Sequence, residues 1–475
     1  MNIPAVAIFI LGLAFPHLAW ATQSVVVHHK VVIVGGGMAG LSAANELSKY
    51  NIPSLIVEGR NRLGGRVETH YFNPQKTAFF EKGGSTIDPD HMATKALAAE
   101  FNVQLVPVDS SNLNIFNGHH QIEEDELNTA LLEIVAFLKD LESKIARNPK
   151  DFQIHSNNST SWKPLKEYLQ GSKLNAFGKD LLKTAMEEHE GMVFDLFPVN
   201  QTGEYTKVFE SLISGKSVEG DDDVYVKVKK GMSFFIEEIA HRLKSKNVSM
   251  LLDHKLIEIR KADGKYLLTF NKGAPIQADY LIMSLPFSTL RDVKMDPSLL
   301  PDFSKEAIKN LSYGTNSKIG FEVNAPVDFF KHINQYYNVK DSVRGWSDER
   351  SYILFVSGQA GQNLTSEIAL KIVNNEMVNL KIVLPNLKYG PPVVKNWVHD
   401  EFSKGSYSAI STTLPDALSA ESKEYKGLRA YANPVDNKHF IFAGEHTRAD
   451  DTQGHIEGAV LSGLLAAKIL KENLK

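Results

Sequence analysis

Three glycines near the start of the chain have the spacing of a phosphate-binding turn. Gly35, Gly37 and Gly40 stand between an apolar stretch, Val31–Val34, and an alanine-rich stretch with helical spacing. At such a strand-to-helix turn the missing side chains let a pyrophosphate approach the backbone, and the helix N-terminus favours negative charge. The pattern predicts that a dinucleotide binds here.

An acidic residue follows the second expected strand, SLIVE, which ends at Glu58. A carboxylate at this point accepts hydrogen bonds from ribose hydroxyls and repels a 2′-phosphate, which disfavours NADP and leaves NAD or FAD. Three arginines then surround a glycine pair in the stretch EGRNRLGGRVET. Ordinary NAD dehydrogenases do not need this basic stretch, so the sequence favours FAD.

This succession and three later segments resemble the flavin-containing amine oxidase family, which includes monoamine oxidases, polyamine oxidases and many L-amino acid oxidases. The later segments are FEKGGSTIDPDH, WVHDEFSKGSYSA and FAGEHTRADDTQGHIEGAVLSG. The resemblance implies FAD as the cofactor. The residues expected to bind it are Gly35, Gly37, Met38, Ala39, Gly40, Glu58, Arg60, Gly65, Arg66, Gly83, Gly84, Ser85, Leu256, Gly444, Glu445, His455 and Ile456.

The resemblance also implies individual roles and the mode of attachment. Arg66 would lie against the pyrophosphate and the flavin, and Glu445 would hold the ribityl chain. Monoamine oxidases of animal mitochondria bond the flavin to a cysteine that precedes a tyrosine. Here Ser406 precedes Tyr407, so we expect the FAD to be non-covalent.

Three residues are candidates for the catalytic site. Lys318 resembles the family lysine that reaches flavin N5 through a water molecule, where a cation would stabilise superoxide during reoxidation; an exposed strand lysine is the alternative. Tyr407 matches one wall of the aromatic pair that sandwiches the amine in monoamine oxidases. The second wall, a tyrosine there, is His455 here. For this histidine, a capping position at a helix start is the alternative.

The elements that must position these residues indicate an α/β fold. A β-α-β unit opens the chain, a mainly helical stretch includes Leu127–Ile145, and strand signals then return with a hairpin turn at Asp263-Gly264. We expect a Rossmann-type FAD-binding lobe assembled from three separated segments, 30–88, 220–290 and 396–475. The segments 89–219 and 291–395 would form a mixed α+β substrate lobe with a helical insertion.

Composition limits the partners. With 52 basic and 56 acidic residues the formal charge is −4, which gives no reason to expect nucleic acid or an anionic membrane. The sequence has no cysteine and no H-x-x-E-H or H-E-x-x-H spacing, so we expect no metal. The expected partners are a small amine and O2, and the oligomeric state stays open, a dimer included.

The first 21 residues have the pattern of a cleavable secretory signal. An apolar core from Ile3 to Phe15 is followed by Pro16 and by small residues at Ala19 and Ala21. This segment has no Lys or Arg, so an uncleaved membrane anchor is the alternative; after cleavage we expect no stable membrane span. Export without any cysteine is typical of a bacterial periplasmic or secreted protein.

The expected activity is FAD-dependent oxidation of a primary or secondary amine to an aldehyde through an imine, with O2 reduced to H2O2. One alternative is an L-amino acid oxidase on the same scaffold. It would need a buried arginine for the substrate carboxylate, such as Arg344 or Arg448. A further alternative is a protein that binds FAD without turnover. The sequence names neither the amine nor the physiological electron acceptor.

Overall fold

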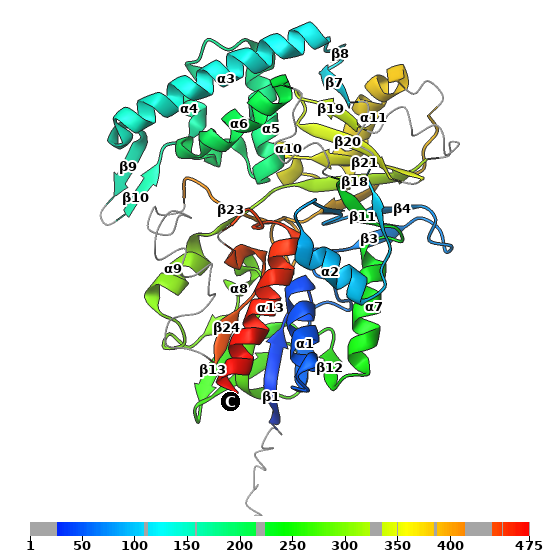
Figure 1. Cartoon of the computed structure of the whole chain (residues 1–475), viewed down its shortest axis with the longest axis vertical. Helices are drawn as coiled ribbons and strands as arrows, with labels where there is room; N and C mark the ends of the chain where they lie inside the picture. Colours follow the sequence, from blue (N-terminus) through cyan, green and yellow to red (C-terminus); the bar gives the residue numbers. More distant parts are fainter. Residues whose placement is uncertain are drawn as a thin grey trace, which may run out of the picture.

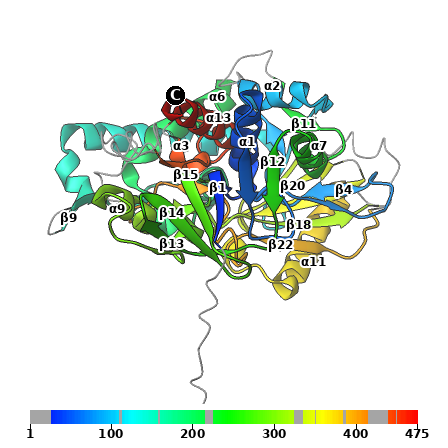
Figure 2. The ribbon, with the colours of Figure 1, turned by 90° about the horizontal axis from the view of Figure 1, so that it is seen from below.

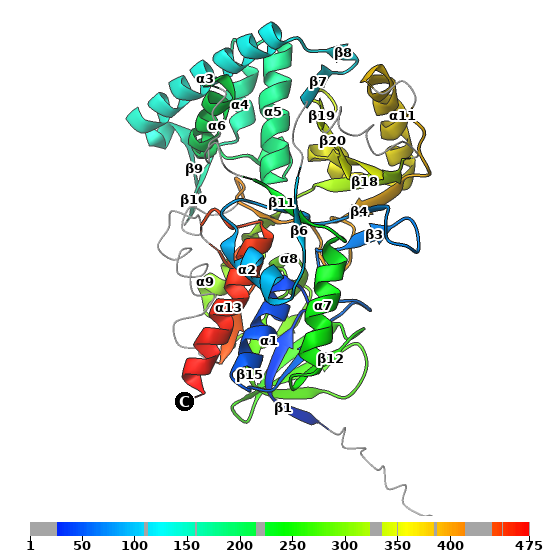
Figure 3. The ribbon, with the colours of Figure 1, turned by 45° about the vertical axis from the view of Figure 1, so that its right-hand side comes forward.

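The computed structural model describes residues 26–108, 113–156, 159–214, 224–323, 335–348, 350–383, 387–413, 439–448 and 450–474. The expected signal segment, residues 1–21, lies outside this range. The described chain forms two lobes, each built on one large sheet (Figures 1 and 3). None of the described helices is both long and apolar enough to cross a membrane.

The lower lobe in Figure 1 contains an eight-stranded sheet with a parallel centre. Its parallel neighbours are, in order, β12 (Val248–Leu251), β2 (Ser54–Val57), β1 (Val27–Val34), β15 (Ile276–Met283) and β24 (Phe440–Phe442). Beyond β15 the sheet continues through β14 (Lys265–Phe270), β13 (Leu256–Ala262) and β16 (Lys294–Met295). The expected hairpin is present between β13 and β14, where Asp263 and Gly264 both have positive φ.

Helices cover this sheet on the side seen uppermost in Figure 2. There α1 (Met38–Lys49) lies between α13 (Ile456–Asn473) and α7 (Met232–Lys244). Small residues let α1 and α13 approach closely: a Cβ added to Gly463 would lie 2.2 Å from the carbonyl oxygen of Ala39. Because α13 is the last helix of the chain, this contact joins the two ends of the described sequence.

The parallel pairing brings several functional positions to one edge of the sheet. Strands β1, β2, β15 and β24 run in the same direction, so their carboxyl ends meet there. The residues that follow these ends are Gly35, Glu58, Ser284 and, after Ala443, Gly444. In open α/β sheets this edge is where ligands bind.

The upper lobe contains a seven-stranded sheet. Its order is β22 (Val393–Asn396), β18 (Ser317–Glu322), β21 (Ser351–Val356), β20 (Val343–Asp348), β19 (Gln335–Asn338), β7 (Leu113–Asn117) and β8 (His120–Gln121). Apolar residues of α11 (Ser366–Val383) pack into its core. A helical cluster stands beside it: α3 (Glu124–Arg147), which contains the expected Leu127–Ile145 helix, α4 (Leu165–Gln170), α5 (Ala176–Glu190) and α6 (Thr202–Ser214) (Figure 3).

Packing extends the lower lobe beyond the expected boundaries. Leu97 and Ala98 of α2 (Met92–Glu100) belong to the core that contains α1 and α13. Ile308 of α9 (Asp302–Asn310) belongs to the core on the other face of the sheet. Both helices lie in segments expected in the substrate lobe. Their apolar residues pack against the lower-lobe sheet and helices instead, which the order of elements along the chain does not reveal.

Short elements complete the described chain. The strands are β3 (Thr69–Tyr71), β4 (Phe79–Glu81), β5 (Thr86–Ile87), β6 (Leu105–Pro107), β9 (Gln153–Ser156), β10 (Ser159–Trp162), β11 (Val226–Val228), β17 (Ser312–Tyr313) and β23 (Ser408–Ala409). The short helices are α8 (Phe287–Leu290) and α10 (Gly358–Gln362), with 3-10 turns at Pro149–Phe152, Phe194–Leu196, Val199–Gln201 and Glu445–Thr447.

The close approach of α1 and α13 gives a stability prediction. Gly463→Ala would place a methyl group against the backbone of α1, which cannot yield as a side chain can, and should destabilise the protein by about 1 to 3 kcal/mol. As a control, Gly203→Ala in α6 meets nothing within 4 Å and should be neutral or stabilising by up to about 1 kcal/mol. The midpoint of urea unfolding measures both; equal midpoints for Gly463→Ala and the wild type would contradict the packing.

Candidate active site

A cavity of about 980 Å³ is lined by residues from both lobes. Every residue expected to bind the cofactor lines it except Gly40, and so do Lys318 and Tyr407. Gly40 has a packing role, because a Cβ there would lie 2.1 Å from the carbonyl oxygen of Gly35. The structure thus brings together segments that are hundreds of residues apart in the sequence.

The N-terminus of α1 opens into the cavity through Gly37, Met38 and Ala39. No side chain caps it, and its first turn carries no acidic residue. Its free amide groups and the positive end of its dipole therefore favour an anion. Gly35 has φ +107, and a Cβ there would lie 2.5 Å from Ser284 Oγ, so the turn requires glycine at this point.

Glu58 is buried at the next strand end. Its carboxylate accepts hydrogen bonds from the backbone N–H of Gly36 (2.7 Å) and of Arg60 (2.9 Å). Burial raises the pKa of Glu58 above its usual value, although these N–H groups oppose the effect. The Arg60 side chain turns to Asp400, which it contacts through both terminal nitrogens. The Glu58 carboxylate can therefore accept further hydrogen bonds from a molecule in the cavity. The charge of Arg60 is already balanced by Asp400.

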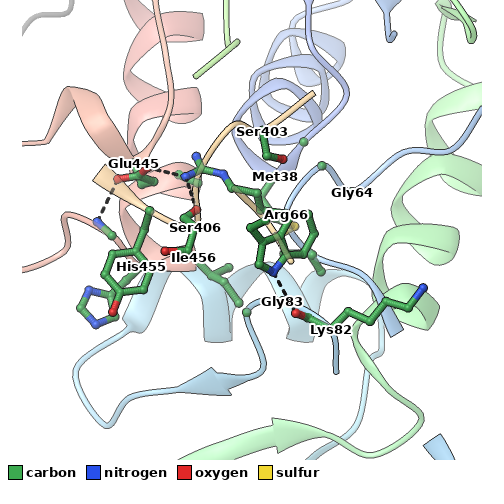
Figure 4. A pocket seen from close by; sticks show the side chains of 18 of the residues that line it. Met38, Gly64, Arg66, Lys82, Gly83, Ser403, Ser406, Glu445, His455 and Ile456 are labelled. Atoms are coloured by element: carbon green, nitrogen blue, oxygen red, sulfur yellow. Dashed lines mark hydrogen bonds and ion pairs between the residues drawn. The ribbon is translucent and has the colours of Figure 1, made fainter. Parts of the chain in front are cut away.

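Half-buried Arg66 and buried Glu445 form an ion pair on the cavity wall (Figure 4). Arg66 Nη1 donates to Glu445 Oε1 (2.8 Å) and to the carbonyl oxygen of Ser406 (2.7 Å). Glu445 also accepts from Ser408 Oγ and from the N–H of Gly454. Burial alone would raise the pKa of Glu445, but Arg66 foremost, then His446 and the Ser408 hydroxyl, lower it to about 2. The carboxylate is therefore ionised at neutral pH.

The N-terminus of α13 also opens into the cavity, at His455 and Ile456. The acidic residue of its first turn, Glu457, points elsewhere: its carboxylate accepts from the N–H groups of Ala93 and Thr94 and so caps α2. The start of α13 has no side-chain cap of its own. Two uncapped helix N-termini, those of α1 and α13, therefore face one cavity.

A glycine segment crosses the cavity wall between these features. A Cβ on Gly83 would lie 1.7 Å from the carbonyl oxygen of Arg66, and one on Gly84 would lie 3.0 Å from Ile456. Trp397 Nε1 donates to the carbonyl oxygen of Lys82 (2.9 Å; Figure 4). The lack of side chains at Gly83 and Gly84 is thus a steric requirement of the wall.

The upper-lobe sheet forms the opposite wall through one row of cross-strand neighbours. In the register of β18, β21, β20 and β19, Lys318 pairs with Phe355, Phe355 with Arg344, and Arg344 with Tyr337. All four residues line the cavity. Trp346, two residues along β20 from Arg344, lines it as well, as the period-2 alternation of a strand requires.

Lys318 is buried, with 7% of its surface exposed. Its ammonium donates to the carbonyl oxygens of Gly83 (2.7 Å) and Glu81 (3.1 Å) and lies 5.4 Å from the centre of the Trp346 ring. Burial lowers the pKa of Lys318, and the attraction of the buried Glu81 and Asp348 only partly offsets this. The alternative of an exposed strand lysine does not describe this residue.

Tyr407 and His455 do not form a stacked pair. The Tyr407 hydroxyl donates to the carbonyl oxygens of Glu188 and His189. Its ring packs against two glycines: an added Cβ would lie 2.7 Å from it at Gly191 and 3.3 Å from it at Gly454. His455 occupies the N-cap position of α13, its side chain is 43% exposed, and its ring packs edge-on against His91. Among the residues placed by the structure, no ring contact joins Tyr407 to His455.

Asp88, His91 and His455 form a cluster whose ligand atoms lie within 4.8 Å of one another, a spacing that a metal ion could use. The hydrogen bonds oppose that use. The backbone N–H of Asp88 donates to His91 Nδ1 (3.1 Å), so the neutral ring carries its proton on Nε2, the atom that faces the Asp88 carboxylate. We therefore assign no metal to this cluster.

The two arginines considered for a substrate carboxylate have different surroundings. Arg344 lines the cavity, where Glu188, Gln335 and Tyr337 surround it. Arg448 pairs with Asp450 and is not among the cavity residues. Sequence reasoning named Arg344 but missed its three neighbours. The alternation of residue types in QYYN and VRGWSD could have indicated that these side chains share one face of two strands. It does not indicate which face of the sheet meets the cavity.

A model of the flavin containing amine oxidoreductase family matches residues 38–470. The chain belongs to this family. Pseudooxynicotine dehydrogenase of Pseudomonas sp is 23% identical to it, over 92% of this chain and 85% of that protein. Polyamine oxidase 3 of Oryza sativa subsp. japonica is 24% identical, over 92% and 88%, and an L-amino-acid oxidase of Mus musculus 23%, over 94% and 71%.

The fold of this chain is similar to that of solved structures. Wild-type putrescine oxidase bound to putrescine superposes with a TM-score of 0.69 at 17% identity, covering 95% of this chain and 100% of that one. The expected mixed α/β fold is thereby confirmed. The expected family membership is confirmed as well, and with it a flavoprotein oxidoreductase; at these identities the relatives do not decide among their different substrates.

The ion pair of Glu445 predicts acid-sensitive stability. Because its pKa is lowered from 4.5 to about 2, the carboxylate stabilises the fold above pH 4.5. This contribution is lost as the pH falls toward 2, at up to about 1.4 kcal/mol per pH unit. Glu445→Gln cannot titrate, so between about pH 6 and about pH 3.5 it should lose less stability in urea unfolding than the wild type does. Glu367→Gln, which removes an exposed partner of Lys371, should follow the wild type; parallel losses in all three proteins would contradict the assignment.

Proposed function

We propose that this protein is an FAD-dependent amine oxidase that converts R-CH2-NH2, O2 and H2O to R-CHO, NH3 and H2O2, with primary or secondary amines as substrates. The observation that carries the proposal is the buried Lys318 ammonium, which faces the same cavity as two uncapped helix N-termini. Export to the periplasm or medium belongs to the same proposal and is supported by the signal-like first 21 residues.

The cavity residues fit a non-covalently bound FAD. The α1 N-terminus would hold the pyrophosphate, Glu58 a ribose, and the α13 N-terminus the electron-rich side of the flavin ring. Ser406 on the wall has a buried Oγ without a hydrogen-bond partner within the described structure. A hydroxyl at that point offers a polar contact, and it cannot form the thioether that a cysteine could. When bound, the flavin supplies two-electron oxidation of the amine and passes the electrons to O2.

The upper-lobe wall suits a neutral amine. Trp346, Phe355 and Tyr407 present aromatic surface to the cavity, which excludes water and lowers the cost of holding an amine without its proton. The Tyr407 hydroxyl, held by the carbonyl oxygens of Glu188 and His189 and by Asn316 Nδ2, fixes the orientation of its ring. The chain therefore contributes mainly position and desolvation to the oxidation step.

Lys318 contributes charge. Its two carbonyl partners hold the ammonium in place without neutralising it. A preorganised cation in a site shielded from water stabilises negative charge that develops on oxygen. The oxidation of the amine develops no such charge at this point, so Lys318 should matter for the oxygen reaction.

An L-amino acid oxidase is the second candidate, because Arg344 lies in the cavity. L-amino-acid oxidases are among the relatives. However, Arg344 Nη1 lies 2.5 Å from Glu188 Oε1, so a substrate carboxylate would have to compete with a carboxylate of the protein. This pairing favours amines without a carboxylate.

The function is tested with the purified, flavin-loaded protein. Under anaerobic conditions, amines should bleach the flavin absorbance, and in air the same amines should give peroxide and aldehyde. Monoamines, diamines, polyamines and L-amino acids form the panel, and acid precipitation should release FAD into the supernatant. A flavin that no amine bleaches would contradict the proposed function, and flavin retained in the pellet would contradict non-covalent binding.

The role of Lys318 is tested by separating the two half-reactions in stopped-flow absorbance. Lys318→Met should slow the return of flavin absorbance in oxygenated buffer by roughly 100-fold and change bleaching by amine far less. In the wild type the return should slow as the pH rises through a value below the usual 10.4 of lysine, because burial lowers the pKa of Lys318 and the cation is lost earlier. Lys371→Met, on the exposed side of α11, is the control. Equal effects on both half-reactions would refute a role specific to oxygen.

A further inference from the structure

Glu188 and Arg344 form an ion pair inside the cavity that the proposed oxidation steps do not use. Glu188 comes from α5 and Arg344 from β20, and both line the cavity. Arg344 Nη1 lies 2.5 Å from Glu188 Oε1, and Nη2 donates to Gln335 Oε1 (3.0 Å). The Tyr337 hydroxyl donates to the second carboxylate oxygen of Glu188. The pair is therefore held on both sides.

This pair lies next to the residues proposed to act on the amine. The carbonyl oxygen of Glu188 accepts from the Tyr407 hydroxyl (2.9 Å). On the other side, the guanidinium carbon of Arg344 lies 5.8 Å from the centre of the Trp346 ring, the same ring that lies 5.4 Å from Lys318 Nζ. A group attached to the α-carbon of a bound amine would therefore enter the field of the pair.

All three arginines that line the cavity have a carboxylate partner in the protein. Arg60 pairs with Asp400, Arg66 with Glu445, and Arg344 with Glu188. The first two pairs involve residues assigned to the cofactor side. Arg344 is thus the one of these three arginines that lies on the proposed substrate side. Its carboxylate partner there is Glu188. Attraction to Glu188 raises the pKa of Arg344, so the guanidinium stays charged and the pair is neutral as a whole.

We propose, on the basis of the function proposed above, that Glu188 determines the substrate class by occupying the guanidinium of Arg344. With Glu188 in place, an α-carboxylate finds the guanidinium of Arg344 already paired and meets the like charge of Glu188, whereas an amine without a carboxylate meets no such repulsion. With the Glu188 charge removed, Arg344 Nη1 loses its carboxylate partner and becomes a charged donor for a substrate carboxylate, while Nη2 stays on Gln335. The same scaffold would then accept L-amino acids.

The test compares substrates that differ only in the α-carboxylate: 2-phenylethylamine with L-phenylalanine, and 1,5-diaminopentane with L-lysine. Glu188→Gln keeps the shape of the side chain and leaves a net positive charge. It should raise the ratio of kcat/KM for the amino acid to that for its amine by about 10- to 100-fold, the value of one charged hydrogen bond. Arg344→Met leaves Glu188 as a net negative charge and should lower the same ratio. The double variant, neutral again, should return the ratio toward the wild-type value.

Controls keep the result decisive. Glu367→Gln removes an exposed carboxylate on α11 and should leave the ratio unchanged, and flavin content and thermal midpoint show which variants are folded. If Glu188→Gln is unfolded, the opposite shift in Arg344→Met still tests the proposal. An unchanged ratio in folded Glu188→Gln, or a shift in the same direction in both single variants, would overturn it.

A binding measurement separates this proposal from the oxidase activity. 3-Phenylpropanoate is L-phenylalanine without its amine, so it cannot be oxidised, and its binding is followed by the change in flavin absorbance. Glu188→Gln should bind it about 10- to 100-fold more tightly than the wild type does. Tighter binding without any turnover would leave the Glu188 proposal standing while the oxidase function fails. Equal affinities in the two proteins would overturn the proposal whatever the activity.

Discussion

The ion pair of Arg66 with the buried carboxylate of Glu445 fixes where the separate parts of the lower lobe meet. Arg66 follows the glycine pair after β2, and Glu445 follows β24 near the end of the chain. Ser408 and Gly454 donate to the same carboxylate, so four segments share one buried charge. Removing a partner from such a charge costs several kcal/mol, and the segments therefore hold one relative position.

The position of Lys318 depends on the same pair through a short series of contacts. Gly83 packs against the carbonyl oxygen of Arg66 so closely that no side chain fits. Its own carbonyl oxygen then accepts from Lys318 Nζ, which belongs to the upper-lobe sheet. A displacement of the Arg66 backbone would therefore reach the Lys318 side chain through Gly83. The contact between the lobes at this point is the hydrogen bond from the Lys318 side chain, and the close packing of Gly83 against Arg66 fixes the position of its acceptor.

The sequence alone indicated positions of the candidate site where the backbone conformation or close packing allows only glycine. Gly35 needs a positive φ and Gly83 has no room for a Cβ, and both of these expected cofactor residues line the cavity. Gly40 belongs to the same motif, but its role is structural: it packs against the backbone of Gly35, where no side chain would fit. The motif predicts the turn, whereas only the three-dimensional arrangement shows which of its glycines line the cavity.

The sequence alone could not predict contacts that depend on the register of the strands and on which helix packs beside the sheet. Arg344 reaches the cavity because β20 pairs with β21 and β19 in one register, and a shift by one residue would turn it to the other face. Glu188 meets it because α5 ends beside that sheet. Neither fact follows from local periodicity. The charge balance of Arg344 is therefore a property of the assembled fold: the arginine supplied by the sheet is paired with a carboxylate supplied by a helix. The open helix N-termini remain as the places where a negatively charged ligand gains most from binding.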